Sequence, residues 1–150
     1  YWYSYAVNVE EAKEEAVRYL KILGKKQFEY PVYLDFEDPS QRRIPTKTKT
    51  DMAIAFMSIL EKNGYYTGLY SSGYWINNQF EKNRLKDYDI WIAHWHVTRP
   101  NCFTPDYGMW QFTNKSKIKG VPDTGEGGVD MNYSYKNYPK IIKNAKLNNF

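Results

Sequence analysis

Hydrophobic and polar positions recur along the chain with two periods, which predict helices joined to short strands. Over 8–24 the apolar residues have the spacing of one helical face; an Asn8–Glu11 capping box begins this helix and Gly24 ends it. A second helical pattern covers 51–60, after a Lys/Thr-rich stretch, and finishes at an Asn-Gly pair. These two segments are therefore expected to be amphipathic helices.

The predicted strands are short, rich in aromatic and β-branched residues, and end in polar side chains. We expect strands over 1–7, 30–39, 67–71, 90–95, 107–112 and 128–132, and shorter helices over 74–80 and 138–147. The alternation of strand and helix up to residue 100 is typical of a parallel sheet. The last two strands lack a long helix between them, and the polar stretches 115–119 and 123–128 are expected to be turns.

The length and composition favour one domain spanning residues 1–150. A chain of 150 residues with 42% hydrophobic and 25% charged residues can form one core and is too short for two comfortable domains. The mean hydropathy is −0.76, and no apolar run is long enough to cross a bilayer. A membrane span is therefore not expected. No leader pattern precedes Tyr1, so any secretion signal was removed, lies outside this chain or never existed.

Charge and aromatic content narrow the choice of partner. The net charge of +4 favours an anionic partner such as a wall polymer, but it falls short of the dense basic stripe typical of nucleic-acid binding. Aromatic residues make up 18% of the chain, which suits a flat or ring-shaped ligand. A single cysteine, Cys102, excludes an internal disulfide.

Polar or aromatic residues recur where each predicted strand ends, as they do at the rim of a (β/α) barrel. They are Asp35, Glu37, Tyr70, Ser71, His94, Trp95, Gln111, Asp130 and Asn132. A full barrel of this kind takes about 250 residues, and only six strands are predicted here. We therefore expect a barrel whose first strands are absent from this chain.

Asp35 and Glu37 are the sharpest chemical feature. Residues two apart on a strand point to the same side, about 6.6 Å apart along it. Two carboxylates in one partly desolvated site favour a protonated acid at neutral pH, as glycoside hydrolysis requires. The simpler alternative is a strand end that forms an ion pair with Arg42 or Arg43. Asp130, after two glycines, would add a third acid, or serve only in a turn.

The remaining rim residues are candidates for substrate binding. Tyr3, Tyr70 and Trp95 could stack on sugar rings, with Gln111 beside them, although each aromatic is individually more typical of a core position. Two alternating histidines at 94 and 96, without a third ligand, make a weak metal site. We expect neither a metal nor a cofactor.

Six blocks of the sequence together resemble the family 25 glycoside hydrolases, the N-acetylmuramidase-type lysozymes. The blocks are YWYSYA (1–6), YPVYLDFE (30–37), GLYS (68–71), IWIA (90–93), MWQF (109–112) and VDMN (129–132). The resemblance implies an α/β fold, a modified TIM-like barrel, that cleaves the β-1,4 bond between N-acetylmuramic acid and N-acetylglucosamine in peptidoglycan. It implies action at the cell wall, as a phage lysin or secreted autolysin.

The same resemblance implies roles for individual residues. Glu37 matches the general acid, Asp35 the neighbouring acid that orients the substrate's 2-acetamido group, and Asp130 the acid of the V-D-x-N block. Tyr70 matches a tyrosine near the cleaved sugar. The chain lacks the family's first strands, with a G-x-D-x-S-x-W-like motif that bears another active-site aspartate. We therefore expect weak or no activity alone, and self-association through exposed barrel edges.

Two other functions remain open from the sequence. A noncatalytic glycan-binding module would use the tyrosines and tryptophans while the acids stay idle. A structural or nucleic-acid-associated domain is suggested only by the excess of lysine, and it predicts salt-sensitive binding to any polyanion.

Overall fold

A six-stranded sheet organises the chain in a computed structural model that describes residues 1–122 and 127–150. The strands are β1 (Trp2–Tyr3), β2 (Val32–Asp35), β3 (Thr67–Ser72), β4 (Asp89–Ala93), β5 (Met109–Ser116) and β6 (Val129–Ser134). They lie in chain order, so that β1 and β6 form the two edges. The pairs from β1 to β5 are parallel, whereas β5 and β6 are antiparallel because no crossover helix separates them.

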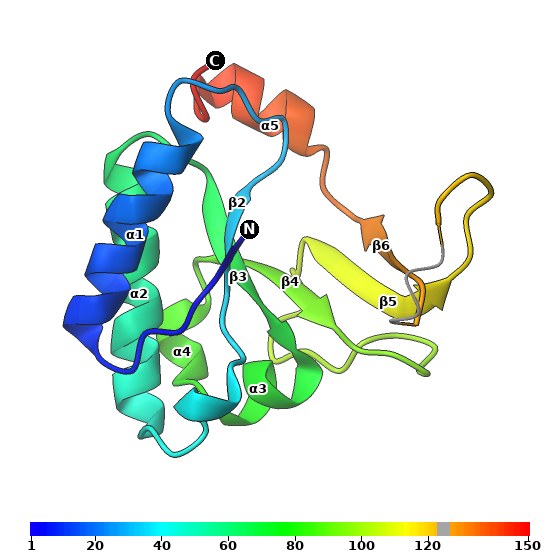
Figure 1. The fold of residues 1–150 in the computed structure, drawn as a ribbon, viewed down its shortest axis with the longest axis horizontal. Helices are drawn as coiled ribbons and strands as arrows, with labels where there is room; N and C mark the ends of the chain where they lie inside the picture. The colour runs from blue at the N-terminus through cyan, green and yellow to red at the C-terminus, as the bar shows by residue number, and fades with distance from the viewer. Residues whose placement is uncertain (123–126) are drawn as a thin grey trace.

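Helices cover one face of this sheet, except for the last helix, which packs against the opposite face. They are α1 (Val9–Leu23), η1 (Pro39–Gln41), α2 (Thr46–Lys62), α3 (Gly73–Asn78), α4 (Lys82–Leu85) and α5 (Tyr138–Ala145). The helices α1 and α2 lie side by side against the sheet, at the left of Figure 1. Alternate strand residues such as Leu34, Leu69 and Ile92 are almost completely buried beneath them. We call this the helix face.

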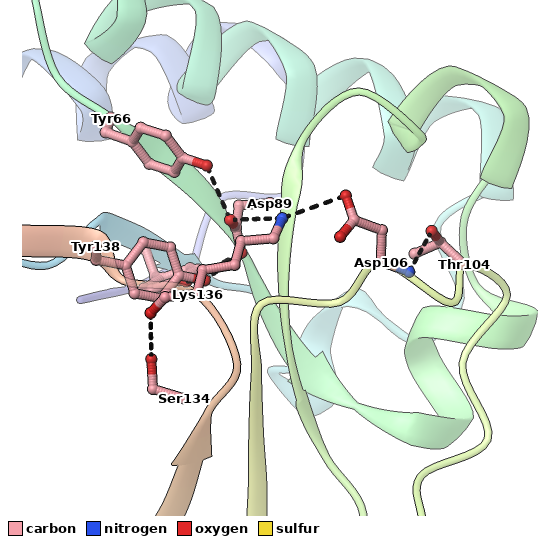
Figure 2. Close-up of polar contacts among 8 residues, drawn as sticks. Tyr66, Asp89, Thr104, Asp106, Ser134, Lys136 and Tyr138 are labelled. Atoms are coloured by element: carbon pink, nitrogen blue, oxygen red, sulfur yellow. Dashed lines mark hydrogen bonds and ion pairs between the residues drawn. The ribbon is translucent and has the colours of Figure 1, made fainter. Parts of the chain in front are cut away.

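The opposite face, which we call the open face, carries the other half of each strand's side chains. A second apolar cluster, containing Tyr33, Tyr70 and Met109, lies here and continues onto α5. At the end of this face where β4 begins, the Asp89 carboxylate accepts hydrogen bonds from four donors. Three of them, Tyr66, Lys136 and Tyr138, are labelled in Figure 2. One donor is Tyr138 of α5, so this network attaches the C-terminal helix to the sheet.

Both predicted long helices are confirmed. Asn8 caps α1 by accepting from the Glu11 N–H, and Gly24 ends it with a positive φ of 57°. The second helix begins earlier than the sequence pattern indicated, at Thr46, directly after Pro45. Proline suits the start of a helix because its missing N–H is not needed there.

The first predicted strand is much shorter than expected. It leaves the sheet after Tyr3, because the Tyr5 N–H turns to the carboxylate of Glu15. The buried Gln41 amide also binds the carbonyls of Ser4 and Ala6. These side-chain hydrogen bonds replace the continued strand ladder.

Smaller differences occur at other element boundaries. The strand predicted over 90–95 ends at Ala93, β5 continues to Ser116 into a predicted turn, and the short helix α4 was not predicted. The last two elements are observed as Val129–Ser134 and Tyr138–Ala145. Most of the turn predicted over 123–128 lies outside the described residues. Within the described ranges, every helix is too short or too polar to cross a bilayer.

Candidate active site

Asp35 ends β2 on the open face, between two tyrosines. Its Cα pairs in register with Tyr3 on one side and Tyr70 on the other. The residue is only 5% exposed, and its Oδ1 atom has no hydrogen-bond partner among the described residues. Burial, reinforced by the charge of Glu37 and partly opposed by the amino group of Tyr1, raises the pKa of Asp35 to about 7. A carboxyl group in this state can hold a proton at neutral pH.

Glu37 lies two residues beyond the end of β2 and is half-buried. Phe36 between the two acids is fully buried in the core of the helix face, as alternation predicts. The Ser72 N–H donates to Glu37 Oε2 at 2.9 Å, which fixes this carboxylate against the end of β3. Burial raises the pKa of Glu37, and the hydrogen bond from Ser72 partly opposes this rise.

The arginine ion pairs that offered a simpler explanation of the two acids do not form. Among the ion pairs of the described residues, none joins Asp35 or Glu37 to Arg42 or Arg43. Both carboxylates are thus partly desolvated without a countercharge from those arginines. This environment favours the neutral form of each acid.

Gln111 of β5 connects the third acid to the aromatic residues. Its Oε1 atom accepts from the Tyr70 hydroxyl at 3.2 Å and from Trp95 Nε1 at 3.0 Å. Its Nε2 atom donates to Asp130 Oδ2 at 3.2 Å. Because the residue is 3% exposed, its amide is better suited to positioning Asp130 than to contacting a ligand directly.

The Tyr70 hydroxyl lies within electrostatic range of all three acids. Burial is the main cause that raises the pKa of its hydroxyl, and the charges of Glu37, Asp35 and Asp130 raise it further. The three carboxylates are therefore close enough to act on one group, although Asp130 is 93 residues from Glu37 in the chain. The structure brings the three predicted acids, Tyr70 and Gln111 to one end of the open face.

The other predicted aromatics lie around this cluster. The Tyr3 hydroxyl donates to Asp38 Oδ2 at 3.1 Å, and burial together with this contact raises its pKa. Trp95 is 39% exposed, with its indole N–H held by Gln111, so its ring remains accessible to a ligand.

Sequence reasoning missed two aromatic members of this site. The ring of Trp91 lies 4.6 Å from that of Tyr70, and its Nε1 donates to Asn132 Oδ1 at 2.8 Å. The ring of Tyr1 stacks against Tyr70 at 6.4 Å. Trp91 could have been identified from strand alternation, since it shares the face of the rim residues.

Two predicted rim residues, Ser71 and His94, and the histidine paired with His94 in the weak metal site do not fit the predicted arrangement. Ser71 points to the helix face, where its hydroxyl donates to the Phe36 carbonyl. His94 and His96 follow the end of β4 rather than alternating on it, and His96 has a φ of 59°. In the part of the chain that the structure describes, no three His, Cys, Asp or Glu side chains cluster as a metal site.

Comparisons with solved structures identify proteins of the same fold. The chain is 26% identical to the CTP1L endolysin, with a TM-score of 0.75, covering 93% of this chain and 47% of that protein. A lysozyme from Streptomyces coelicolor is 20% identical, with a TM-score of 0.69 and coverage of 92% and 66%. A family 25 glycosyl hydrolase from Bacillus anthracis is 20% identical, with a TM-score of 0.66 and coverage of 94% and 66%.

The chain thus spans about half the length of the endolysin and two thirds of the other two proteins. These likenesses confirm the expected α/β class and the lysozyme-type fold. A comparison with curated proteins found no match. The model of glycosyl hydrolases family 25 matches residues 1–121, which is most of the chain, and the protein therefore belongs to that family.

Proposed function

We propose that this chain carries the acid pair of a peptidoglycan hydrolase that cleaves the β-1,4 bond between N-acetylmuramic acid and N-acetylglucosamine. The observation that supports this most directly is the desolvated pair Asp35 and Glu37 beside Tyr70, with Asp130 held toward the same place by Gln111. Family membership supports the same chemistry. The partner is the glycan strand of bacterial peptidoglycan.

In this mechanism Glu37 is the general acid. Burial raises its pKa, which favours the protonated carboxyl group that donates to the glycosidic oxygen. Asp35 orients the 2-acetamido group of the substrate through its unpartnered oxygen, and Asp130 stabilises positive charge that develops on the sugar. Tyr70, Trp91 and Trp95 supply ring surfaces for the sugars.

The place of action follows from the substrate. Peptidoglycan lies outside the cytoplasmic membrane, so we propose that the protein acts at the cell wall. One solved relative, the Cpl-1 endolysin, was crystallised with a peptidoglycan analogue; it is 22% identical with a TM-score of 0.60. We further propose that two copies associate through the sheet edges at β1 and β6, which ultracentrifugation would detect as a dimer.

The decisive experiment counts new reducing ends released from purified peptidoglycan. We expect weak or no release by this chain alone; where release is measurable, Glu37→Gln should lower it about 10²- to 10⁴-fold, with wall binding retained. Glu29→Gln, at an exposed position, is the matched control and should leave the rate unchanged. Wall binding without any new reducing ends would instead favour the noncatalytic glycan-binding module. Rapid lysis of a wall suspension would contradict the expectation that this chain is weakly active alone.

A second comparison separates the two acids. If Glu37 donates the proton, Asp35→Asn should retain more activity than Glu37→Gln and should alter the pH profile near pH 7, where Asp35 titrates. If Asp35→Asn is instead the more damaging change, the roles assigned to the two carboxylates are reversed.

A further inference from the structure

A pocket lies beside α3, the helix that directly follows β3. It has a volume of about 370 Å³ and is lined by Arg42, Tyr74, Trp75 and Gln79. Tyr74 and Trp75 belong to α3, whose preceding residue, Ser72, binds Glu37 through its N–H. Arg42 directly follows η1, the short helix after the acid pair. The pocket is thus lined by residues that follow soon after Glu37 and Ser72 in the chain.

A buried lysine stands behind the wall of this pocket. Lys49 of α2 is 1% exposed; its Nζ donates to Gln79 Oε1 and lies 5.1 Å from the centre of the Trp75 ring. Within the described residues, none of the ion pairs gives Lys49 a carboxylate partner. Burial lowers its pKa. A buried ammonium group is costly unless an anion compensates it.

The residues that line the pocket offer a cation, an aromatic ring and hydrogen-bond donors, which are the groups that bind a negatively charged saccharide. Arg42 is exposed at the mouth of the pocket, and a guanidinium group binds a carboxylate through two parallel hydrogen bonds. Tyr74 is 66% exposed and offers a ring for stacking on a sugar. The Gln79 amide, held by Lys49 through its oxygen, has its N–H groups left to donate.

From this arrangement we infer that the pocket of Arg42, Tyr74, Trp75 and Gln79, with Lys49 behind it, is a subsite for the carboxylate of a muramyl residue in the glycan. The inference rests on the proposed function, because it names the part of that substrate which the pocket takes. N-acetylmuramic acid carries a carboxyl group that N-acetylglucosamine lacks. In the wall, the carboxylate comes from the lactyl group itself or from the peptide attached to it, and Arg42 and Lys49 distinguish muramyl from glucosaminyl units by this charge.

The test is a binding titration followed through the indole N–H signal of Trp75. The probes are N-acetylmuramic acid, muramyl dipeptide, N-acetylglucosamine and inorganic phosphate. We expect the two muramyl probes to shift the signal, and Arg42→Gln and Lys49→Met each to weaken their binding about 10-fold or more. Arg43→Gln removes the neighbouring exposed charge outside the pocket and should leave binding unchanged. The tighter of the two muramyl probes identifies which carboxylate the pocket takes.

Several outcomes would overturn the inference. It fails if N-acetylglucosamine shifts the Trp75 signal as strongly, if phosphate binds as tightly as the muramyl probes, or if Arg42→Gln binds them like the wild type. Because Arg42 is exposed, Arg42→Gln should fold normally, and its binding of the muramyl probes tests the subsite even if Lys49→Met does not fold. These probes contain no glycosidic bond between two sugars, so their binding is measured separately from the release of reducing ends from peptidoglycan. Muramyl binding without any release of reducing ends would refute only the proposed hydrolysis. Release of reducing ends without muramyl binding would refute only the subsite.

Discussion

Two aspartates at opposite ends of the open face are equally buried and have opposite surroundings. Asp35 and Asp89 are each 5% exposed. Asp89, at the start of β4, accepts hydrogen bonds from Tyr33, Tyr66, Lys136 and Tyr138. Asp35, at the end of β2, has an oxygen without a partner among the described residues, and its pKa is raised.

The difference shows that burial alone does not indicate what a carboxylate does. Donors around Asp89 compensate its desolvation and connect β2, β4 and α5, so this group stabilises the fold (Figure 2). Asp35 lacks such compensation, which costs stability and leaves the group ready to exchange a proton or bind a ligand. The same side chain is structural at one end of the sheet and chemically available at the other.

The largest expected effect is the loss of Asp89. Asp89→Ala leaves three tyrosine hydroxyls and the ammonium group of Lys136 without their shared acceptor, and we expect it to lower the free energy of unfolding by about 4 kcal/mol. Urea denaturation measures this. Asp106→Ala removes the other carboxylate that contacts Lys136, one that is 84% exposed, and should cost less than about 0.5 kcal/mol. Similar losses for the two variants would show that the Asp89 network does not stabilise the fold.

Gly108→Ala tests the Asp89 network without removing any of its polar groups. A Cβ atom at this position would overlap the Tyr138 hydroxyl and Asp89 Oδ1, so Gly108→Ala should push the network apart at a cost of about 3 kcal/mol. The melting temperature reports the loss. Gly64→Ala is not a suitable control because Gly64 has a φ of 80°; Ser40→Ala, at an exposed position, serves instead. An unchanged melting temperature for Gly108→Ala would mean that the network relaxes easily.

Asp35→Asn should raise the free energy of unfolding, whereas the two preceding substitutions lower it. The pKa of Asp35 is raised to about 7 in the folded chain, so the native state loses stability as the pH rises from about 4, where an unperturbed aspartate titrates, to about 7. Asparagine does not titrate, and we expect the variant to be more stable than the wild type by about 2 kcal/mol at pH 8, after allowing for solvent screening. The gain should vanish near pH 4. Urea midpoints across this range measure it, and a gain independent of pH would exclude the titration of Asp35 as its cause.

The smallest expected effect comes from a single hydroxyl group of the Asp89 network. Tyr138→Phe removes one donor and leaves the other three, so we expect a loss of about 1 kcal/mol in the free energy of unfolding. Tyr74→Phe, at a position 66% exposed, is the control and should change stability by less than about 0.5 kcal/mol. A loss for Tyr138→Phe as large as that for Asp89→Ala would show that the donors act as one unit.

Much of the fold and of the candidate site could be predicted from local sequence. Helix α1 follows from its cap, its periodicity and Gly24, which are all local signals. The pair Asp35 and Glu37 could be identified because a buried strand ends there. The short first strand could not, since it is ended by hydrogen bonds to Glu15 and Gln41, which come from later parts of the chain.

The site also shows where local reasoning stops. The partners of the Gln111 amide, which are Tyr70, Trp95 and Asp130, could not be predicted because they come from three other chain segments. Lys49 lies in the Lys/Thr-rich stretch before the predicted helical pattern, and nothing in its neighbours along the chain indicates that its charge is buried. Such environments arise from packing between elements, which a periodic pattern does not specify.

The sequence by itself determined the order of the six strands and of α1, α2, α3 and α5 along the chain. It also determined the face that each long helix buries and the placement of acids where a strand ends. These features depend on periodicity and on neighbouring residues. Only the tertiary structure decided which buried carboxylate is compensated. The Asp89 donor Tyr138 lies 49 residues further along the chain, and no comparable donor reaches Asp35 Oδ1 within the described residues. Hydrogen-bond partners at such separations are set by how the elements pack, and that packing separates a structural aspartate from a reactive one.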